Sequence, residues 1–371
     1  MKKIIIAGHI CLDITPIFSN EYTGKSDKIL TAGETIHMDT ADIHTGGVVA
    51  NTGLAMKILG SDVKLVGKIG EDAFGDIINN ILDEYDVDNK MIIDTSSTSS
   101  YSIVISPPGI DRIFLHHPGA NATFSNLDLS DDLFEDVGLF HFGYPPLMKR
   151  MYENQGEELV RLFKRVKEKG IVTSLDMTAV DANSDAGKQN WRKILTRLLP
   201  YVDIFAPSAE EIGYMLDAKL FSLWKERAQG RDVTEIISIK EDVDPLGKQL
   251  IEMGSKIVLI KCGAPGLYYR TSNLETISNI ADGFIKDPLE WADRSGFEKS
   301  YKQEKVLSGT GAGDTTIAAF LTSINMGYSL EKCLQLATAT GALSVTQYDA
   351  LSGLKTIPEM EDMIQKGWKK C

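Results

Sequence analysis

The clearest chemical pattern in the sequence is a glycine-rich turn that leads into an apolar segment. Gly309, Gly311 and Gly313 alternate with other residues, Asp314 follows directly, and an apolar run at 317–321 comes next. Glycines let a backbone approach a ligand closely, and a helix that begins there directs its unpaired N–H groups and the positive end of its dipole at the same point. The turn therefore suits a phosphate, with an ordinary helix start as the alternative. A carboxylate beside a phosphate repels it, so Asp314 indicates a chemical task such as accepting a proton.

Two further polar side chains occupy positions from which they could bind a ligand. Asp13 lies just beyond the short run at 4–7, whose pattern is typical of a strand buried on both faces. Ligands of open α/β sheets collect at the carboxyl ends of strands, so Asp13 is a candidate ligand group, with a turn or cap carboxylate as the alternative. Gly46 and Gly47 open a helix, and Asn51 could present a donor and an acceptor from its first turn. The alternative for Asn51 is a hydrogen bond within that turn.

The elements that must position these groups alternate between strand and helix patterns along most of the chain. Runs that predict strands lie at 4–7, 63–69, 137–142, 171–175, 202–206 and 256–260. Segments that predict helices lie at 47–60, 152–169, 191–199, 246–253, 317–326, 331–345 and 358–366, with one more after Gly75 and room for another within 216–244. This alternation predicts an α/β fold with a mostly parallel central sheet flanked by helices and joined by right-handed crossovers. No internal repeat interrupts it, so we expect a single domain over residues 1–371.

Three segments interrupt that alternation. Residues 15–42 are polar and irregular, and residues 99–117 alternate between apolar and polar side chains around Pro107-Pro108-Gly109, which predicts a hairpin. Together these two segments predict a small β-sheet that leans over one face of the main domain as a lid. Residues 271–304 are polar but contain Trp291. We expect this insertion to fold over the nucleotide or substrate edge, with a surface loop as the alternative.

Composition and charge argue against several classes of partner. The 371-residue chain carries a net charge of −13 with acidic and basic residues mixed, which argues against nucleic acid or an anionic membrane as the main partner. Its four cysteines show no CxxC spacing, so neither a zinc site nor a disulfide framework is expected. No apolar stretch reaches the roughly 20 residues of a membrane helix, and the apolar start ends too early for a signal peptide. We expect a cytoplasmic protein with reduced thiols.

Six separated motifs resemble, in order, those of the ribokinase-like carbohydrate kinases, also called the phosphofructokinase-B (PfkB) family. They are Gly8…Asp13, Gly46-Gly47…Asn51, Gly70-Glu71-Asp72…Gly75, Gly119-Ala120-Asn121, Val202-Asp203-Ile204…Pro207…Glu211 and Gly311-Ala312-Gly313-Asp314. They cover nearly the whole chain. The resemblance implies a ribokinase-like, Rossmann-type sandwich with a small β-sheet lid. It also implies transfer of the γ-phosphoryl group of ATP to a hydroxymethyl group of a carbohydrate, with Mg²⁺.

The same resemblance implies roles for individual residues. Asp314 would be the catalytic base, and the N–H groups of Gly311, Ala312 and Gly313 would form an anion hole. Asp13, Gly46, Gly47 and Asn51 match sugar-hydroxyl contacts of the family. Ser208, Gly263, Gly266, Thr310 and Thr338 match nucleotide contacts, and Glu211 matches the acid that organises Mg²⁺ through water. These roles agree with the chemistry, since phosphoryl transfer depends mainly on positioning, a metal ion and fixed dipoles.

The sequence departs from the family pattern at one segment and two single residues. Ser308-Gly309-Thr310 stands where the family often has Asp-Thr-Thr, so activation by a monovalent cation is left open. Ser208 replaces the usual asparagine of the magnesium and phosphate motif, with a shorter reach to a phosphate oxygen or water. Val48 stands where ribokinases tend to have a lysine near the sugar, which argues against ribose.

Other functions of a glycine-rich α/β chain fit less well. A nicotinamide-dependent dehydrogenase would need a GxGxxG turn after the first strand, and the segment from Gly8 to Asp13 has none. A Walker-type NTPase would need Lys-Ser/Thr where the chain has Asp314. A nucleoside kinase of the same fold is the nearest alternative, because the fold does not fix the acceptor. A catalytically silent sugar-binding regulator would lack the base. Exposed lid edges favour a homodimer, in which pairing would cover them.

Overall fold

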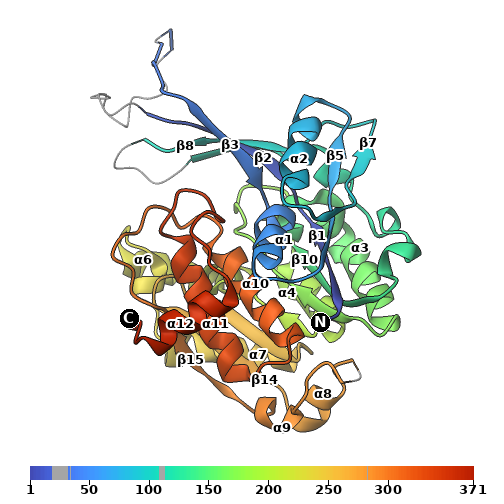
Figure 1. Ribbon diagram of the computed structural model, residues 1–371, viewed down its shortest axis with the longest axis vertical. Helices are drawn as coiled ribbons and strands as arrows, with labels where there is room; N and C mark the ends of the chain where they lie inside the picture. The colour runs from blue at the N-terminus through green and yellow to red at the C-terminus, as the bar shows by residue number, and fades with distance from the viewer. Residues whose placement is uncertain (19–31, 34, 108–112, 282) are drawn as a thin grey trace.

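A nine-stranded sheet forms the centre of the computed structural model, which describes residues 1–18, 32–33, 35–107, 113–281 and 283–371 (Figure 1). In spatial order the strands are β15 (Ser295–Lys299), β14 (Gly266–Thr271), β13 (Ile257–Lys261), β12 (Ile204–Phe205), β11 (Val172–Leu175), β10 (Val137–Gly143), β1 (Lys3–Gly8), β4 (Val63–Val66) and β6 (Asp88–Asn89). The seven strands from β13 to β6 are parallel, and β14 and β15 continue the sheet antiparallel. The predicted α/β fold with a mostly parallel sheet is confirmed.

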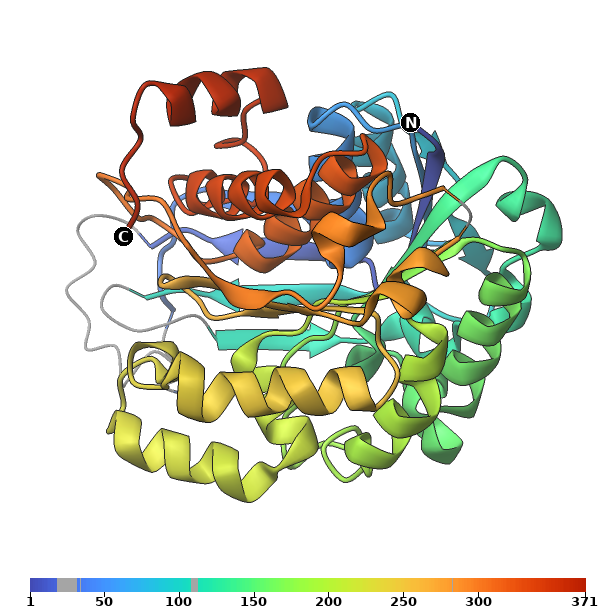
Figure 2. The ribbon, with the colours of Figure 1, turned by 90° about the horizontal axis from the view of Figure 1, so that it is seen from below.

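Helices cover both faces of the sheet. Alternate residues of a strand point to opposite faces, so Ile4 and Ile6 of β1 belong to one core and Ile5 and Ala7 to the other. One layer holds α1 (Val48–Ile58), α2 (Ala73–Asp83), α10 (Ala312–Asn325), α11 (Leu330–Ser344) and α12 (Ile357–Gln365). The other layer holds α3 (Lys149–Glu168), α4 (Trp191–Leu198), α5 (Ala209–Leu216), α6 (Ala218–Ala228) and α7 (Asp244–Glu252). Figure 2 shows the red helices and the green and yellow helices on opposite sides of the sheet. No helix in the described part of the chain is long and apolar enough to cross a bilayer, and the cytoplasmic location stays a prediction.

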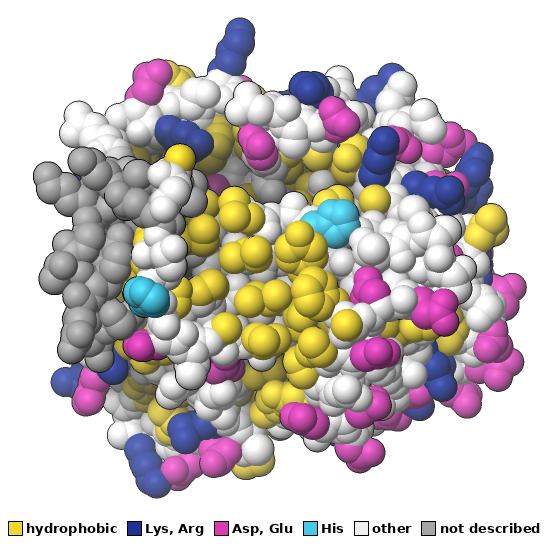
Figure 3. All heavy atoms as spheres, turned by 90° about the horizontal axis from the view of Figure 1, so that it is seen from above, with side chains coloured by type: hydrophobic (Ala, Val, Ile, Leu, Met, Phe, Trp, Pro, Cys, Tyr) yellow, Lys and Arg dark blue, Asp and Glu magenta, His cyan; other side chains and the backbone are white. Residues whose placement is uncertain are grey.

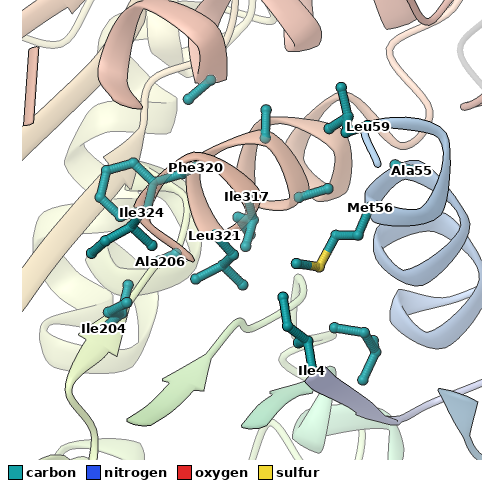
Figure 4. Close-up of a cluster of buried hydrophobic side chains, with 14 of the residues drawn as sticks. Ile4, Ala55, Met56, Leu59, Ile204, Ala206, Ile317, Phe320, Leu321 and Ile324 are labelled. Carbon is teal, nitrogen blue, oxygen red and sulfur yellow. The ribbon is translucent and has the colours of Figure 1, made fainter. Parts of the chain in front are cut away.

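The helix that follows the glycine turn, α10, packs against α1 and the sheet. Ile317 and Leu321 of α10 lie beside Met56 of α1 and above Ile4 of β1, and all four side chains are buried (Figure 4). Each buried aliphatic side chain stabilises the fold by about 1.5–3 kcal/mol. This contact therefore helps to fix the two helices relative to each other and to the sheet.

A four-stranded sheet stands over the carboxyl ends of the central strands. Its order is β3 (Ala41–Gly46), β2 (Cys11–Pro16), β8 (Tyr101–Ile105) and β9 (Ile113–His117). The hairpin predicted within 99–117 is β8 and β9, although residues 108–112 at its turn and 19–31 of the first lid segment lie outside the described residues. Asp13 lies beyond the carboxyl end of β1 as predicted, but it belongs to a strand rather than to a turn, and the small sheet begins at Cys11, before the predicted bound of residue 15. The chain leaves β1 at Gly8 and enters β2, so Asp13 lies within the small sheet.

One predicted strand is divided in the structure. Residues 63–69 form β4 in the central sheet and β5 (Lys68–Gly70), which pairs with β7 (Ile92–Asp94) in a separate two-stranded sheet. The chain changes sheets at Gly67, where a Cβ atom would lie 2.7 Å from Cγ2 of Ile10. The apolar pattern runs across this change because both strands are buried, so the pattern alone did not reveal it.

Contrary to our expectation, most of the described part of the insertion at 271–304 lies away from the ligand edge. Strand β14 runs antiparallel to β13 and ends at Thr271, opposite Ile257, so the chain leaves the sheet at the end remote from the glycine turn. Helices α8 (Leu274–Ser278) and α9 (Pro288–Trp291) lie there, and Figure 1 shows them at the bottom while the small sheet is at the top. Strand β15 then returns along β14. The polar composition reflects a surface connection, and its Trp291 packs against Phe320 of α10.

Candidate active site

Asp314 is the third residue of α10, directly after the glycine turn. Gly311 caps the helix with φ 70°, and a Cβ atom there would overlap with Ala350, so the turn requires glycine. The first hydrogen bond within the helix runs from Thr315 N to Gly311 O at 2.8 Å. The N–H group of Gly313 therefore has no partner within the helix. The N–H group of Ala312 donates to Gly309 O at 3.3 Å, so this member of the predicted anion hole is engaged within the turn.

Three side chains hold the carboxylate of Asp314, which is 2% exposed. The Asn51 amide donates to Oδ2 at 2.9 Å, the Tyr144 hydroxyl lies 2.8 and 2.9 Å from the two oxygens, and the Thr52 hydroxyl lies 3.4 Å from Oδ1. The Asn51 side chain thus bonds the acid across the helix pair, while its backbone N–H donates to Gly47 O in its own first turn. Burial raises the pKa of Asp314, and the hydrogen bonds from Asn51 and Tyr144 and the charge of Lys261 oppose that rise.

Tyr144 adopts a backbone conformation that is uncommon for a bulky residue. It follows β10 with φ 63° and ψ 39°, between Gly143 and Pro145. Such conformations cost free energy and concentrate at functional sites. Here the conformation directs the phenol toward Asp314. Burial and then the charge of Asp314 raise the pKa of Tyr144 well above its ordinary value, so the hydroxyl stays protonated and donates.

Lys261 and Asp176 form a buried ion pair beside the glycine turn. Lys261 ends β13 and Asp176 follows β11, and Lys261 Nζ lies 2.6 Å from Oδ1 of Asp176. A Cβ atom on Gly313 would lie 3.3 Å from Nζ of Lys261, so the ammonium group adjoins Gly313 of the turn. Burial raises the pKa of Asp176 above its ordinary value, and the charge of Lys261 opposes that rise without cancelling it.

Ser208 and Glu211 form a capping box at the N-terminus of α5. Glu211 N–H donates to Oγ of Ser208 at 3.2 Å, and Ser208 N–H donates to Oε2 of Glu211 at 2.7 Å. The backbone of Ser208 bridges that of Lys261. The charge of Glu211 also acts on Asp176 and Lys261, and it raises the pKa of both. The structure thus brings Glu211 to the ion pair, and the metal and phosphate roles of this capping box stay predictions.

The other predicted sugar-binding residues lie where β2 pairs with β3 and the chain enters α1. A Cβ atom on Gly46 would overlap with the carboxylate of Asp13. Gly47 has φ 85°, and a Cβ atom on it would lie 2.6 Å from both Nδ1 and the backbone O of His9. The two glycines therefore make room for Asp13 and His9. Their contact with a sugar stays a prediction.

The remaining predicted nucleotide residues make their hydrogen bonds locally. Gly263 and Gly266 bond each other in the turn after β13, where Gly266 N–H donates to Gly263 O at 3.2 Å. Thr338 in α11 donates its hydroxyl to Leu334 O at 3.1 Å, and Thr310 N–H donates to Oγ of Ser308 at 3.1 Å. Gly341 of α11 lies where a Cβ atom would overlap with Thr316, so the small residues of this helix serve close packing against α10.

Sequence reasoning passed over Tyr144, Asp176 and Lys261 as site residues. All three stand at or just after the carboxyl ends of parallel strands, namely β10, β11 and β13. The rule that selected Asp13 would have selected them. Their pairing could not be foreseen, because it depends on strand order in the sheet.

The sequence is similar to those of known carbohydrate kinases. A model of the pfkB family carbohydrate kinases matches residues 8–357. The chain is 24% identical over 330 residues to fructokinase-1 of Oryza sativa subsp. japonica, which covers 86% of the chain and 88% of that relative. It is 23% identical over 334 residues to an ATP-dependent 6-phosphofructokinase of Thermoanaerobacterium thermosaccharolyticum, with 89% and 88% covered.

Solved structures share the fold over nearly the full length. An E. coli chain assigned as a ribokinase II, solved with ATP and Mg²⁺, superposes with a TM-score of 0.71 at 20% identity and covers 99% of this chain and 100% of its own. Together with the family match across residues 8–357, this likeness shows that the chain belongs to the pfkB family of carbohydrate kinases, ATP-dependent phosphotransferases with an alcohol group as acceptor.

Proposed function

We propose that this kinase transfers the γ-phosphoryl group of ATP to a hydroxymethyl group of a sugar or related polyol, with Asp314 as the general base. The observation that carries the proposal is the position of Asp314 on the first turn of α10, next to the glycine turn and held by Asn51 and Tyr144. A base must lie within hydrogen-bond reach of the hydroxyl that attacks. A carboxylate fixed beside an anion-binding turn meets that requirement for a hydroxyl placed against a γ-phosphate.

The proposed step moves one proton and one phosphoryl group. The acceptor oxygen bonds to the γ-phosphorus as Asp314 takes its proton, and the bond from that phosphorus to the bridging oxygen breaks, which releases ADP. The N–H group of Gly313 and the ammonium group of Lys261 lie side by side, where they can stabilise charge on the phosphoryl oxygens. Gly311 and Ala312 complete the anion hole if the Ala312 N–H turns from Gly309 to the ligand.

Mg²⁺ fits the carboxylates near Lys261. The Oδ2 atom of Asp176 is buried and has no hydrogen-bond partner among the described residues, and Glu211 acts on the same group. No set of three described acidic, histidine or cysteine side chains is arranged to hold a metal alone, which suits an ion that keeps waters and binds phosphates. Glu211 and Asp176 would hold the magnesium ion. When bound, Mg²⁺ would supply positive charge to the phosphates. We propose that five further residues contact the nucleotide around the ends of β13 and α11, namely Thr310, Ser208, Gly263, Gly266 and Thr338.

An acceptor screen tests the proposed function. One relative is named a fructokinase and another a 6-phosphofructokinase, so the family leaves the acceptor open. We expect purified protein with Mg-ATP to release ADP only when a suitable sugar is added, and faster with sugars than with nucleosides. The turnover rate should be the same with K⁺ as with tetramethylammonium as the monovalent cation, because the side chain of Ser308 has no carboxylate to bind the cation. A preference for nucleosides would favour the nucleoside-kinase alternative, and no turnover across the panel would favour the regulator.

We also propose that the protein forms a homodimer through the outer face of the small sheet. One apolar row crosses the four strands of this sheet. It consists of paired residues, in the strand order β3, β2, β8 and β9: Ile43, Ile14, Ile103 and Leu115. Ile43 and Leu115 are each 47% exposed, and Figure 3 shows hydrophobic side chains gathered at this end of the molecule. An apolar row on a sheet with open edges favours association.

Leu115→Asp is expected to convert the dimer to monomer, because it places a charge within the proposed apolar contact. Analytical ultracentrifugation at micromolar concentration measures the change. Leu127→Asp is the matched control, since Leu127 is 85% exposed and stands away from the small sheet. A wild-type protein that sediments as a monomer would contradict the proposal.

A further inference from the structure

Two histidines present unpaired ring nitrogens on the inner side of the small sheet. His9 is 2% exposed, and neither of its ring nitrogens has a hydrogen-bond partner among the described residues. The Nε2 atom of His116 in β9 is also buried and unpaired there, while its Nδ1 atom lies 3.1 Å from Oγ of Ser102. The two rings are 5.3 Å apart.

These rings connect the small sheet to the proposed base. The His9 ring lies 6.0 Å from that of Tyr144, whose hydroxyl binds Asp314. Asp13 is paired with Ser102, which is paired with His116, so these three side chains share the inner face of the small sheet. The acceptor must reach Asp314 from this side, since the glycine turn and Lys261 occupy the phosphate side.

Unpaired buried nitrogens need a physical explanation. A buried polar atom without a partner costs about 1–3 kcal/mol, and native proteins leave few of them. Three such atoms lie on two neighbouring rings. Simple ring packing would be served equally well by phenylalanine, which carries no such cost. Because Nδ1 of His9 faces Gly47, hydrogen bonds to a ligand would chiefly explain the two Nε2 atoms.

The chemistry of the surroundings indicates which ligand. Burial lowers the pKa of both histidines, which leaves neutral rings that can donate and accept. Asp13 contributes a negative charge. The strands β2, β3, β8 and β9 contain no lysine or arginine, although Lys25, Lys28 and Arg112 lie outside the described residues. A phosphate or carboxylate on the acceptor would meet a carboxylate here, whereas hydroxyl groups would find partners.

We propose that His9 and His116 bind hydroxyl groups of a neutral, unphosphorylated polyol at the end of the acceptor remote from Asp314. This inference rests on the proposed kinase function. It adds an acceptor class and two residues that the family motifs do not contain.

Steady-state kinetics with neutral sugars, their phosphates and sugar acids tests the inference. We expect wild-type enzyme to prefer a neutral acceptor. His9→Phe and His116→Phe should each raise the acceptor KM about 10–100-fold, with the KM for ATP unchanged and kcat within a few-fold. His116→Gln should keep a KM close to that of the wild type, because its amide reaches the position of Nε2. His117→Phe is the matched control, since His117 is in the same strand but on the opposite face and is paired with Thr98.

Two results would overturn the inference while the kinase function stands. One is a preference of the wild type for a sugar phosphate or acid. The other is an unchanged acceptor KM in His116→Phe. This substitution alters the small sheet and not the core, so it tests the inference even if His9→Phe fails to fold. An absence of turnover with every acceptor would instead contradict the proposed function, and this inference with it.

Discussion

Replacing Asp314 by asparagine is expected to reduce acceptor-dependent turnover by about 10²–10⁴-fold. The amide keeps the shape of the side chain and can still accept from Tyr144, but it cannot take the proton of the attacking hydroxyl. ATP binding should change little, because the N–H groups of the turn and Lys261 remain. Turnover and the Kd for ATP, measured on the same preparation, separate the two effects.

The same substitution should leave the fold as stable as the wild type or more stable at neutral pH. Folding raises the pKa of Asp314, chiefly through burial. An acid whose pKa is raised in the folded state destabilises that state while it is ionised, and the cost disappears as the pH falls through the raised pKa. A neutral amide removes this cost. The melting temperature at pH 7 should therefore not fall.

Asp242→Asn is the matched control for Asp314→Asn. Asp242 is also buried, but it accepts hydrogen bonds from Trp224, Arg227 and Ser238, and these contacts outweigh burial and lower its pKa. We expect this variant to lose stability and keep its turnover, the reverse of Asp314→Asn. Near-normal turnover in Asp314→Asn would remove this residue from the role of base.

Periodicity predicted the fold because the central strands are buried on both faces. The runs at 4–7, 137–142 and 256–260 are mostly apolar, and each became a strand of the parallel sheet within one or two residues at either end. The glycine turn was equally clear, since Gly311 takes a positive φ at a helix cap. Local backbone geometry and burial are properties that a sequence records directly.

Properties that depend on long-range contact were not predictable in the same way. The bond from Asn51 to Asp314 joins residues 263 positions apart, and the pair of Lys261 and Asp176 exists because their strands end at one edge of the sheet. The insertion was misplaced for a related reason. Its polar composition does not say whether β14 runs parallel or antiparallel to β13, and that direction decides at which end of the sheet the chain emerges.

Replacing Lys261 by methionine is expected to lower kcat by about 10²–10³-fold, the usual effect of removing one group that stabilises transition-state charge. The variant should also move the acid limb of the pH–rate profile to higher pH. The base must be ionised to act, so turnover falls as the pH drops through the pKa of Asp314. Lys261 lowers that pKa, and its removal lets the pKa rise.

A purely structural role for Lys261 would not move the pH profile, and the chain offers a close control for that role. Lys256, at the other end of β13, lies 2.7 Å from buried Asp203, and its side chain is 13% exposed, as is that of Lys261. Lys256→Met should lower the melting temperature and leave both kcat and the acid limb in place. Lys261→Met alone would leave the buried carboxylate of Asp176 without its partner, which is costly. A double variant that also carries Asp176→Asn avoids this cost and should stay folded. If the folded double variant keeps wild-type kcat, Lys261 acts only in holding the sheet together.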